Sequence, residues 1–260
     1  MKIPDSHPRA ESLRIREKLI KAHMEGLVAT AGLIAHGRGE AFDYLLGEQT
    51  LPFAKRAERV AVALLLKAEK KVISVNGNSA ALCAGDLVEL SRLTGAQLEV
   101  NLFYRSEERE LAIANELKRW GASEVLGVEA AASTSIPGLM GGRGKVDARG
   151  IAEAEVVLVP LEDGDRTAFL RKAGKVVIAI DLNPFSRTSQ TASVTIIDNI
   201  VRALPNMLNE AQLLKQSPEK LDSIVLEYDN SETLSEAINF INSRLQHIAN
   251  ITRRNHARGA

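Results

Sequence analysis

The chain has 260 residues, and its 33 Lys and Arg balance 33 Asp and Glu, so the formal net charge is zero at pH 7. This length accommodates one substantial α/β domain, and the charge balance argues against nucleic acid or an anionic membrane as a partner. A single cysteine excludes an intramolecular disulfide and a thiolate zinc cluster, and the sequence shows neither a leader pattern nor a long apolar run, which predicts a cytoplasmic protein.

Helical patterns fill the first 70 residues. Apolar side chains recur at helical spacing over 6–35, with Pro8 at a place that suits a first helical turn. The two glycines of His36-Gly37-Arg38-Gly39-Glu40 predict a basic turn that ends this helix, because glycine frees the backbone from helical geometry. Ala and Leu recur among charged residues over 52–70, which predicts another helix.

From residue 71 onward, short apolar runs rich in β-branched residues alternate with helical stretches. The predicted strands are 72–75, 98–102, 125–128, 156–159, 176–180 and 194–197. The predicted helices between them are 79–93, 106–120, 166–173 and 199–214. Because the strands are continuously apolar, both of their faces must be buried, as in a parallel sheet covered by helices. The sequence therefore predicts an α/β fold, a Rossmann-like three-layer sandwich with a mostly parallel sheet.

The C-terminal stretch 231–253 carries an apolar stripe at helical spacing, including Leu234, Ile241 and Leu245. A terminal amphipathic helix must bury that stripe, either on its own sheet or across a dimer interface. We expect a single domain over the whole chain. Its parts are an N-terminal helical segment (1–70), a Rossmann-like core (71–230) and a C-terminal helix with a basic tail (231–260).

Ligands of open α/β sheets bind beyond the carboxyl ends of the strands, so the residues that follow each strand are the candidates for a site. The segment after 176–180 is the strongest of these, because it combines Asp181, Asn183, Arg187 and Thr188. Asp181 and Asn183 suit hydroxyl groups or a base edge, or Asp181 holds Mg²⁺ through water, and Arg187 and Thr188 suit phosphate oxygens. A loop that only turned the chain would not need these residue types together.

Other strand ends carry weaker signals. Asn76-Gly77-Asn78-Ser79 opens a helix whose N-terminus suits a phosphate or carboxylate, although a helix-capping turn explains the same residues. Asn199 also begins a helix, and it is either a helix cap or part of the site. The segment 160–166 holds three carboxylates, which either bind an amine or a metal or form the acidic first turn of a helix.

Several common motifs are missing. The glycine-rich stretch 138–146 has Leu139 and Val146 where a Walker A motif needs Gly and Ser or Thr, so it is either a basic loop over substrates or a plain connection. Gly37-Arg38-Gly39 fails the dinucleotide fingerprint, and the five histidines lack metal-ligand spacing, so no resident metal site is assigned. An NAD(P)-dependent oxidoreductase and a non-catalytic nucleotide-binding module stay open as alternatives on fold alone.

Four blocks, in this order along the chain, make the sequence recognisable. They are SHPRAESL (6–13), HGRGEAFDYL (36–45), PLEDGDR (160–166) and DLNPFSRT (181–188). Together they resemble the archaeal phosphopantothenate synthetase family, the 4-phosphopantoate–β-alanine ligases, over nearly the whole chain.

The resemblance implies a homodimer that joins 4-phosphopantoate to β-alanine in coenzyme A biosynthesis. ATP with Mg²⁺ would activate the acid as an acyl-adenylate, releasing pyrophosphate and then AMP. The implied nucleotide contacts are Arg16, Arg38, Asp181, Leu182, Asn183, Arg187, Thr188, Asn199 and Ile200. Of these, Arg38 and Arg187 are expected to act catalytically, because a guanidinium stabilises charge on phosphate oxygens. Asn76, Asn78 and Ser79 are the expected substrate-binding residues.

Overall fold

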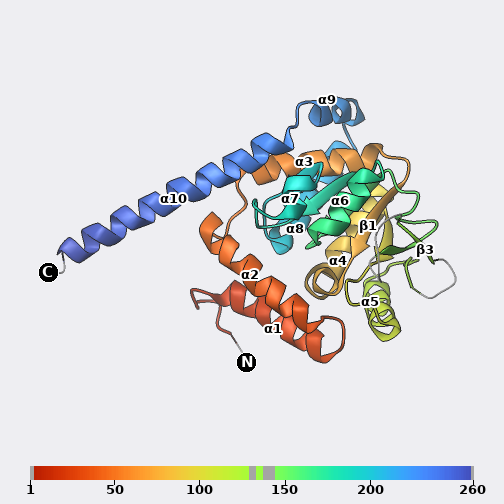
Figure 1. Cartoon of the computed structure of the whole chain (residues 1–260), viewed down its shortest axis with the longest axis horizontal. Helices are drawn as coiled ribbons and strands as arrows, with labels where there is room; N and C mark the ends of the chain where they lie inside the picture. Colours follow the sequence, from red (N-terminus) through yellow and green to blue (C-terminus); the bar gives the residue numbers. More distant parts are fainter. Residues whose placement is uncertain (1–2, 129–132, 137–143, 259–260) are drawn as a thin grey trace.

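A five-stranded parallel sheet forms the centre of the part of the chain that the computed structural model describes, residues 3–128, 133–136 and 144–258 (Figure 1). The strand order is β2-β1-β5-β6-β7. Their bounds are β1 Lys71–Val75, β2 Gln97–Val100, β5 Val156–Pro160, β6 Val176–Ile180 and β7 Val194–Ile196. This is a doubly wound order in which the direction of winding reverses between β1 and β5. The predicted α/β fold is confirmed.

Side chains alternate between the two faces of the sheet, and both faces are covered. On one face, the largest apolar cluster joins the strands to helices α3, α4, α5 and α8. On the other face, a smaller cluster joins Val72 and Val157 to α6 and to the segment 144–154. The helices named here are α3 Pro52–Lys67, α4 Gly77–Thr94, α5 Glu107–Arg119, α6 Gly164–Lys172 and α8 Ile200–Leu214. The continuously apolar strands thus reflect burial on both sides.

The predicted strand 125–128 is wrong. It reduces to one isolated parallel bridge between Leu126 and Glu99, next to β2. Gly127 follows with a φ of 75°, a left-handed conformation that turns the chain away from the sheet. A separate antiparallel pair, β3 Ser133–Ser135 and β4 Lys145–Asp147, was not predicted. Most of the glycine-rich stretch, 137–143, lies outside the described residues.

The predicted turn at His36–Glu40 is also wrong, because helix α2 (Thr30–Leu46) runs through it. The break comes earlier, after α1 (Ala10–Met24), where Gly26 has a φ of 82°. A glycine inside a helix costs only about 1 kcal/mol, which tertiary contacts can offset. Leu182 lies close to Gly39, with its Cδ1 atom 3.7 Å from the place that a Cβ would take. A left-handed glycine, in contrast, ends a helix directly.

The C-terminal helix α10 (Asn230–Arg258) begins on the core and then extends away from it (Figure 1). Its first turns bury Leu234, Ala237 and Ile241 in a third apolar cluster with Leu46 and Phe53. Three short helical pieces were not predicted: α7 Arg187–Thr191, a 3₁₀ helix Pro218–Lys220 and α9 Leu221–Leu226. Within the described residues, we find no helix with the length and apolarity to span a bilayer.

A buried polar network lies where α3 meets α8. Asn206 Nδ2 on α8 donates to Glu58 Oε1 and to Thr50 Oγ1, each at 3.3 Å, and the Thr50 hydroxyl donates to Asp198 at 2.6 Å. Glu58 is only 1% exposed. Burial raises its pKa to about 8, an effect that the hydrogen bond from Asn206 only partly offsets. Glu58 is therefore protonated in the folded protein at neutral pH.

Replacing Glu58 with Gln should remove a pH dependence of stability. The folded pKa of about 8 exceeds the ordinary value of 4.5, so the wild type loses stability relative to Glu58→Gln as pH rises from 4.5 through 8. From the size of the shift, the difference should reach about 3 to 5 kcal/mol above pH 8. Urea unfolding at pH 5 and pH 9 measures it, and a difference that is equal at both pH values would contradict the assignment.

Candidate functional site at the carboxyl edge of the sheet

Helix α2 lies across the carboxyl edge of the sheet, where the polar residues that follow the strands gather. It contacts the ends of β1, β6 and β7 through residues spaced seven and four positions apart, which share one helical face. The contacts are Gly32 with Asn78, Gly39 with Leu182, and Asp43 with Asn199. A side chain at Gly32 would collide with Asn78 Oδ1. Helix α2 is thus the roof of this edge.

The segment after β6 folds around the carboxylate of Asp181. Oδ1 accepts the backbone N–H of Asn183 at 2.9 Å, and Oδ2 accepts the hydroxyl of Ser186, which also caps α7. Burial raises the pKa of Asp181, whereas these hydrogen bonds and the positive charge of Arg38 act to lower it. The carboxylate therefore fixes the shape of the loop between β6 and α7.

The first turns of α6 and α7 meet next to this loop. The Thr188 hydroxyl donates to the carbonyl of Glu162 at 2.9 Å, and Arg187 Nη1 pairs with Asp165 Oδ1 at 2.7 Å. A side chain on Gly164 would collide with Cβ of Arg187. Thr188 is buried, but the Arg187 side chain is 75% exposed. Arg187 thus extends into solvent from a tightly packed joint.

The other two predicted arginines lie on different helices and have different neighbours. Arg38 is exposed on α2, and its charge acts on Asp181. Arg16 on α1 donates from Nε and Nη2 to Glu40 Oε2 at 3.1 and 2.7 Å. Burial opposes ionisation of Glu40, but hydrogen bonds from Ser12 and Arg16 lower its pKa to about 2. The charge of Arg38 thus acts on Asp181, whereas Arg16 is paired with Glu40.

Asn199 and Ile200 follow β7. Asn199 caps α8 by accepting the N–H of Val201 at 3.3 Å, as its capping interpretation predicts. Its Nδ2 donates to Asp43 Oδ2 at 2.9 Å, and this carboxylate also accepts from Arg202 on α8, with an Nη2 to Oδ1 distance of 2.6 Å. Ile200 is buried in the main core. The network of Asp43, Asn199 and Arg202 joins the roof helix to the end of β7.

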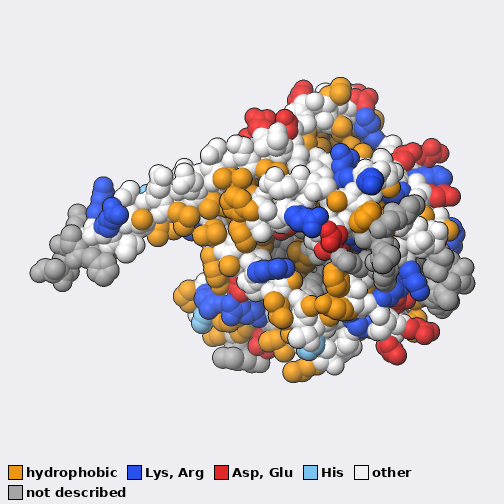
Figure 2. Space-filling view, in the orientation of Figure 1, with side chains coloured by type: hydrophobic (Ala, Val, Ile, Leu, Met, Phe, Trp, Pro, Cys, Tyr) orange, Lys and Arg blue, Asp and Glu red, His pale blue; other side chains and the backbone are white. Residues whose placement is uncertain are grey.

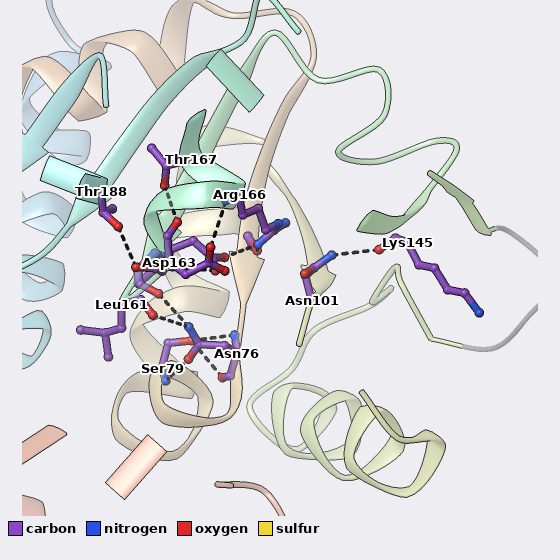
Figure 3. Close-up of polar contacts among 12 residues, drawn as sticks. Asn76, Ser79, Asn101, Lys145, Leu161, Asp163, Arg166, Thr167 and Thr188 are labelled. Atoms are coloured by element: carbon purple, nitrogen blue, oxygen red, sulfur yellow. Dashed lines mark hydrogen bonds and ion pairs between the residues drawn. The ribbon is translucent and has the colours of Figure 1, made fainter. Parts of the chain in front are cut away.

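The turn after β1 is a reciprocal cap. Asn76 Oδ1 accepts the N–H of Ser79, and Ser79 Oγ accepts the N–H of Asn76, both at 3.0 Å. Asn76 Nδ2 donates to the carbonyl of Pro160 at 2.8 Å and so joins the ends of β1 and β5 (Figure 3). Asn78 Nδ2 donates to the Gly32 carbonyl on the roof. The capping interpretation is confirmed, and a role of these residues in substrate binding stays a prediction.

The acidic segment 160–166 runs from the last residue of β5 into the first turn of α6. Asp163 caps the helix by accepting the N–H of Arg166 at 3.0 Å, and Glu162 pairs with the guanidinium of Arg166. This outcome matches the interpretation as an acidic helix start. Across the described ranges, no group of three His, Cys, Asp or Glu side chains has the arrangement of a metal site.

Two features of the site escaped sequence reasoning. The pairing of Asp43 with Arg202 joins residues 159 positions apart, and no local pattern reports it. The burial of Arg166 was not expected either, because arginine usually lies at the surface. The sequence does place Arg166 four residues after Glu162, and this spacing could have indicated an ion pair, since residues four apart on a helix form such pairs.

Comparison with known proteins identifies the family. A sequence model described as phosphopantothenate/pantothenate synthetase matches residues 53–244. The chain belongs to this family. The resemblance drawn from the four sequence blocks is therefore confirmed, and the carboxyl edge described above is the candidate site of a phosphopantothenate/pantothenate synthetase.

Named relatives within this family are similar to the chain over almost their full length. The 4-phosphopantoate–β-alanine ligase of Thermococcus kodakarensis is 54% identical over 249 residues, which cover 95% of each chain. The protein of that name from Methanosarcina mazei is 52% identical over 95% of this chain and 97% of its own. The one from Methanospirillum hungatei is 48% identical over 95% and 99%, respectively.

The contact of α6 with α7 yields a test of the site geometry. Gly164→Ala should push the backbone of Arg187 and Thr188 away and destabilise the fold by about 1 to 3 kcal/mol. The matched control is Gly37→Ala on α2, which meets no atom within 4 Å and should stabilise the helix by about 0.5 to 1 kcal/mol. Urea unfolding of both variants measures the effects, and equal stabilities would contradict this packing.

Proposed function

We propose that the chain is an ATP-dependent ligase that condenses 4-phosphopantoate with β-alanine to give 4'-phosphopantothenate in coenzyme A biosynthesis. The observation that carries the proposal is 54% identity over 95% of both chains to a protein named for this ligation. The fold adds support. The blocks at 36–45, 160–166 and 181–188 lie on the roof helix, at the start of α6 and at the start of α7, all at the carboxyl edge.

The chemistry requires activation of the acid. A carboxylate is a poor electrophile until one of its oxygens belongs to a good leaving group, and transfer of AMP from ATP, with loss of pyrophosphate, supplies that group. The amine of β-alanine then attacks the acyl carbon and AMP leaves. The protein must stabilise the crowded negative charge of a triphosphate, a phosphate and a carboxylate.

Arg38 and Arg187 are the cations placed for this charge. The charge of Arg38, on α2, acts on Asp181, and the exposed side chain of Arg187 lies where the first turns of α6 and α7 meet. The planar guanidinium group matches the geometry of phosphate oxygens. Together with Thr188, Asn199 and the loop fixed by Asp181, they would bind the nucleotide at the ends of β6 and β7.

Mg²⁺ would enter with the nucleotide. The described residues fit this mode, because a magnesium ion bound to a triphosphate needs only one or two protein carboxylates, often through water. Asp165 is a half-exposed carboxylate beside Arg187 and would be the residue that holds it. The ion would add positive charge along the phosphates.

The proposed route predicts its products. Incubation of the pure chain with ATP, Mg²⁺, 4-phosphopantoate and β-alanine should yield 4'-phosphopantothenate, AMP and pyrophosphate in equal amounts, measured by chromatography. Formation of ADP and phosphate instead would replace the acyl-adenylate by an acyl phosphate. ATP binding without turnover would identify a non-catalytic module, and binding of a nicotinamide cofactor without ATP would favour an oxidoreductase.

Arg187→Ala should lower kcat/KM by roughly 30- to 1,000-fold. The loss of a donor that follows charge in the transition state costs about 2 to 4 kcal/mol. Because the side chain is 75% exposed, the melting temperature should change little. Arg92→Ala is a control on α4, where the arginine pairs with Glu89 at the surface. Steady-state kinetics check the prediction, and an unchanged kcat/KM for Arg187→Ala would exclude the role.

We further propose that the chain forms a homodimer through α10. The apolar stripe that is buried at Leu234 and Ile241 continues along the projecting half of the helix at Leu245, Ile248 and Ile251, which are 47%, 44% and 44% exposed. Figure 2 shows apolar side chains gathered along one side of this helix. A stripe of this length outside the core needs a partner surface, and a second copy of the chain supplies a self-complementary one.

The double substitution Leu245→Glu and Ile248→Glu should convert the dimer to a monomer. Two carboxylates in an apolar interface would each have to be desolvated without a partner. Light scattering after size exclusion should show half the wild-type mass, whereas the control Gln246→Glu, on the polar side of α10, should keep the dimer. A monomeric wild type, or a dimeric double variant, would contradict the proposal.

A further inference from the structure

Arg166 is the largest side chain that the described part of the chain buries completely. It leaves the first turn of α6 and extends toward β1, as Figure 3 shows. Its Nη1 donates to Ser74 Oγ on β1 at 3.1 Å and pairs with Glu162 Oε2. A single nitrogen of the guanidinium, Nη1, therefore interacts with both of these acceptors.

The other two nitrogens of the guanidinium are buried but unused. Nε and Nη2 of Arg166 have no hydrogen-bond partner within the described ranges. The N–H bonds of these two nitrogens lie in the guanidinium plane and point outward from the same edge, where they form a fork that matches two oxygens of a phosphate or carboxylate. A buried charged donor without an acceptor is costly. A fork that is positioned but empty is therefore typical of a binding site for an oxyanion.

The carboxylates of Glu162 and Glu99 do not fill this fork. The carboxylate of Glu162 is paired with Nη1 through Oε2. Glu99, on β2, interacts with the charge of Arg166, but its own two oxygens accept the backbone N–H groups of Asp147 and Ile151 at 3.0 and 2.6 Å. The fork thus keeps its positive potential for an incoming anion.

The location of Arg166 is the one where an α/β sheet binds ligands. Ser74, its partner, precedes the last residue of β1, and Arg166 itself follows β5 by six residues. The winding of the sheet reverses between these two strands, and open α/β sheets bind ligands at the carboxyl ends of the strands at such a reversal. The capped N-terminus of the 18-residue α4 opens at the same strand end and adds positive potential.

We propose that Nε and Nη2 of Arg166 bind two oxygens of the phosphate group of 4-phosphopantoate. This inference rests on the proposed function. 4-Phosphopantoate carries its reacting carboxylate and its phosphate at opposite ends. If the carboxylate faces a nucleotide at the ends of β6 and β7, the phosphate is directed away from it, toward β1 and β5, where Arg166 lies. Arg166 would then select the phosphorylated acid.

The experiment compares KM values for all three substrates in the full-length enzyme. Arg166→Lys keeps the charge but cannot form the fork, so KM for 4-phosphopantoate should rise about 10- to 100-fold. KM for ATP and for β-alanine should stay within twofold of the wild type. Arg92→Lys, at a surface pair on α4, is the matched control and should change none of the three.

A second variant tests the same role in case Arg166→Lys does not fold. Arg166→Met combined with Glu162→Gln removes both charges of the buried pair and so leaves no unpaired ion. With its melting temperature within a few degrees of the wild type, it should show the same selective rise in KM for 4-phosphopantoate.

Three results would overturn the role of Arg166: an unchanged KM for 4-phosphopantoate in both variants, a rise confined to β-alanine, which would assign the fork to its carboxylate, or a rise confined to ATP. A wild-type chain without ligase activity would overturn the proposed function itself. The two failures are therefore distinguishable.

Discussion

The packing of α2 across the carboxyl edge of the sheet is the constraint on which the candidate site depends. The absence of a side chain allows the close approach at Gly32, and the buried carboxylate of Asp43 fixes the far end against Asn199 and Arg202. Removing one partner of such a buried pair leaves an uncompensated charge, which is strongly unfavourable. The roof therefore has one well-defined position, and the residues that it carries, Arg38 among them, are held over the strand ends.

The edge divides into two halves with different chemistry. At β6 and β7, polar groups belong to a loop shaped by Asp181 and to an exposed arginine, Arg187, which suits a large, partly solvated nucleotide. At β1 and β5, the cation is the enclosed Arg166, which suits one compact anion. Two anionic molecules brought together would repel each other in water, and separate sites for their charges on a rigid sheet edge offset that repulsion.

The features that could be predicted from the sequence are those that depend on residues close together in the chain. The five strands of the sheet and the helix beginning at Pro52 follow from apolar runs and helical spacing within a few residues, and the Asp181 loop was found because its polar residues are adjacent. The continuation of α2 past Gly37 and Gly39 depends on contacts with Leu182, far along the chain, so local propensity pointed to a turn. The strand expected at 125–128 failed at Gly127, and the burial of Arg166 depends on Ser74, 92 residues away.

The hydrogen bonds of Asp43 also bear on the order in which the molecule assembles. Its partner Arg202 lies 159 residues later in the chain. The helices α1 and α2 leave the ribosome long before the groups that dock them are synthesised. Closing so long a loop costs entropy that only the finished sheet can compensate. We expect the β-α units to collapse first and helices α1 and α2 to pack onto them last. A nascent chain that stops before Arg202 would then have strands and helices but no assembled site.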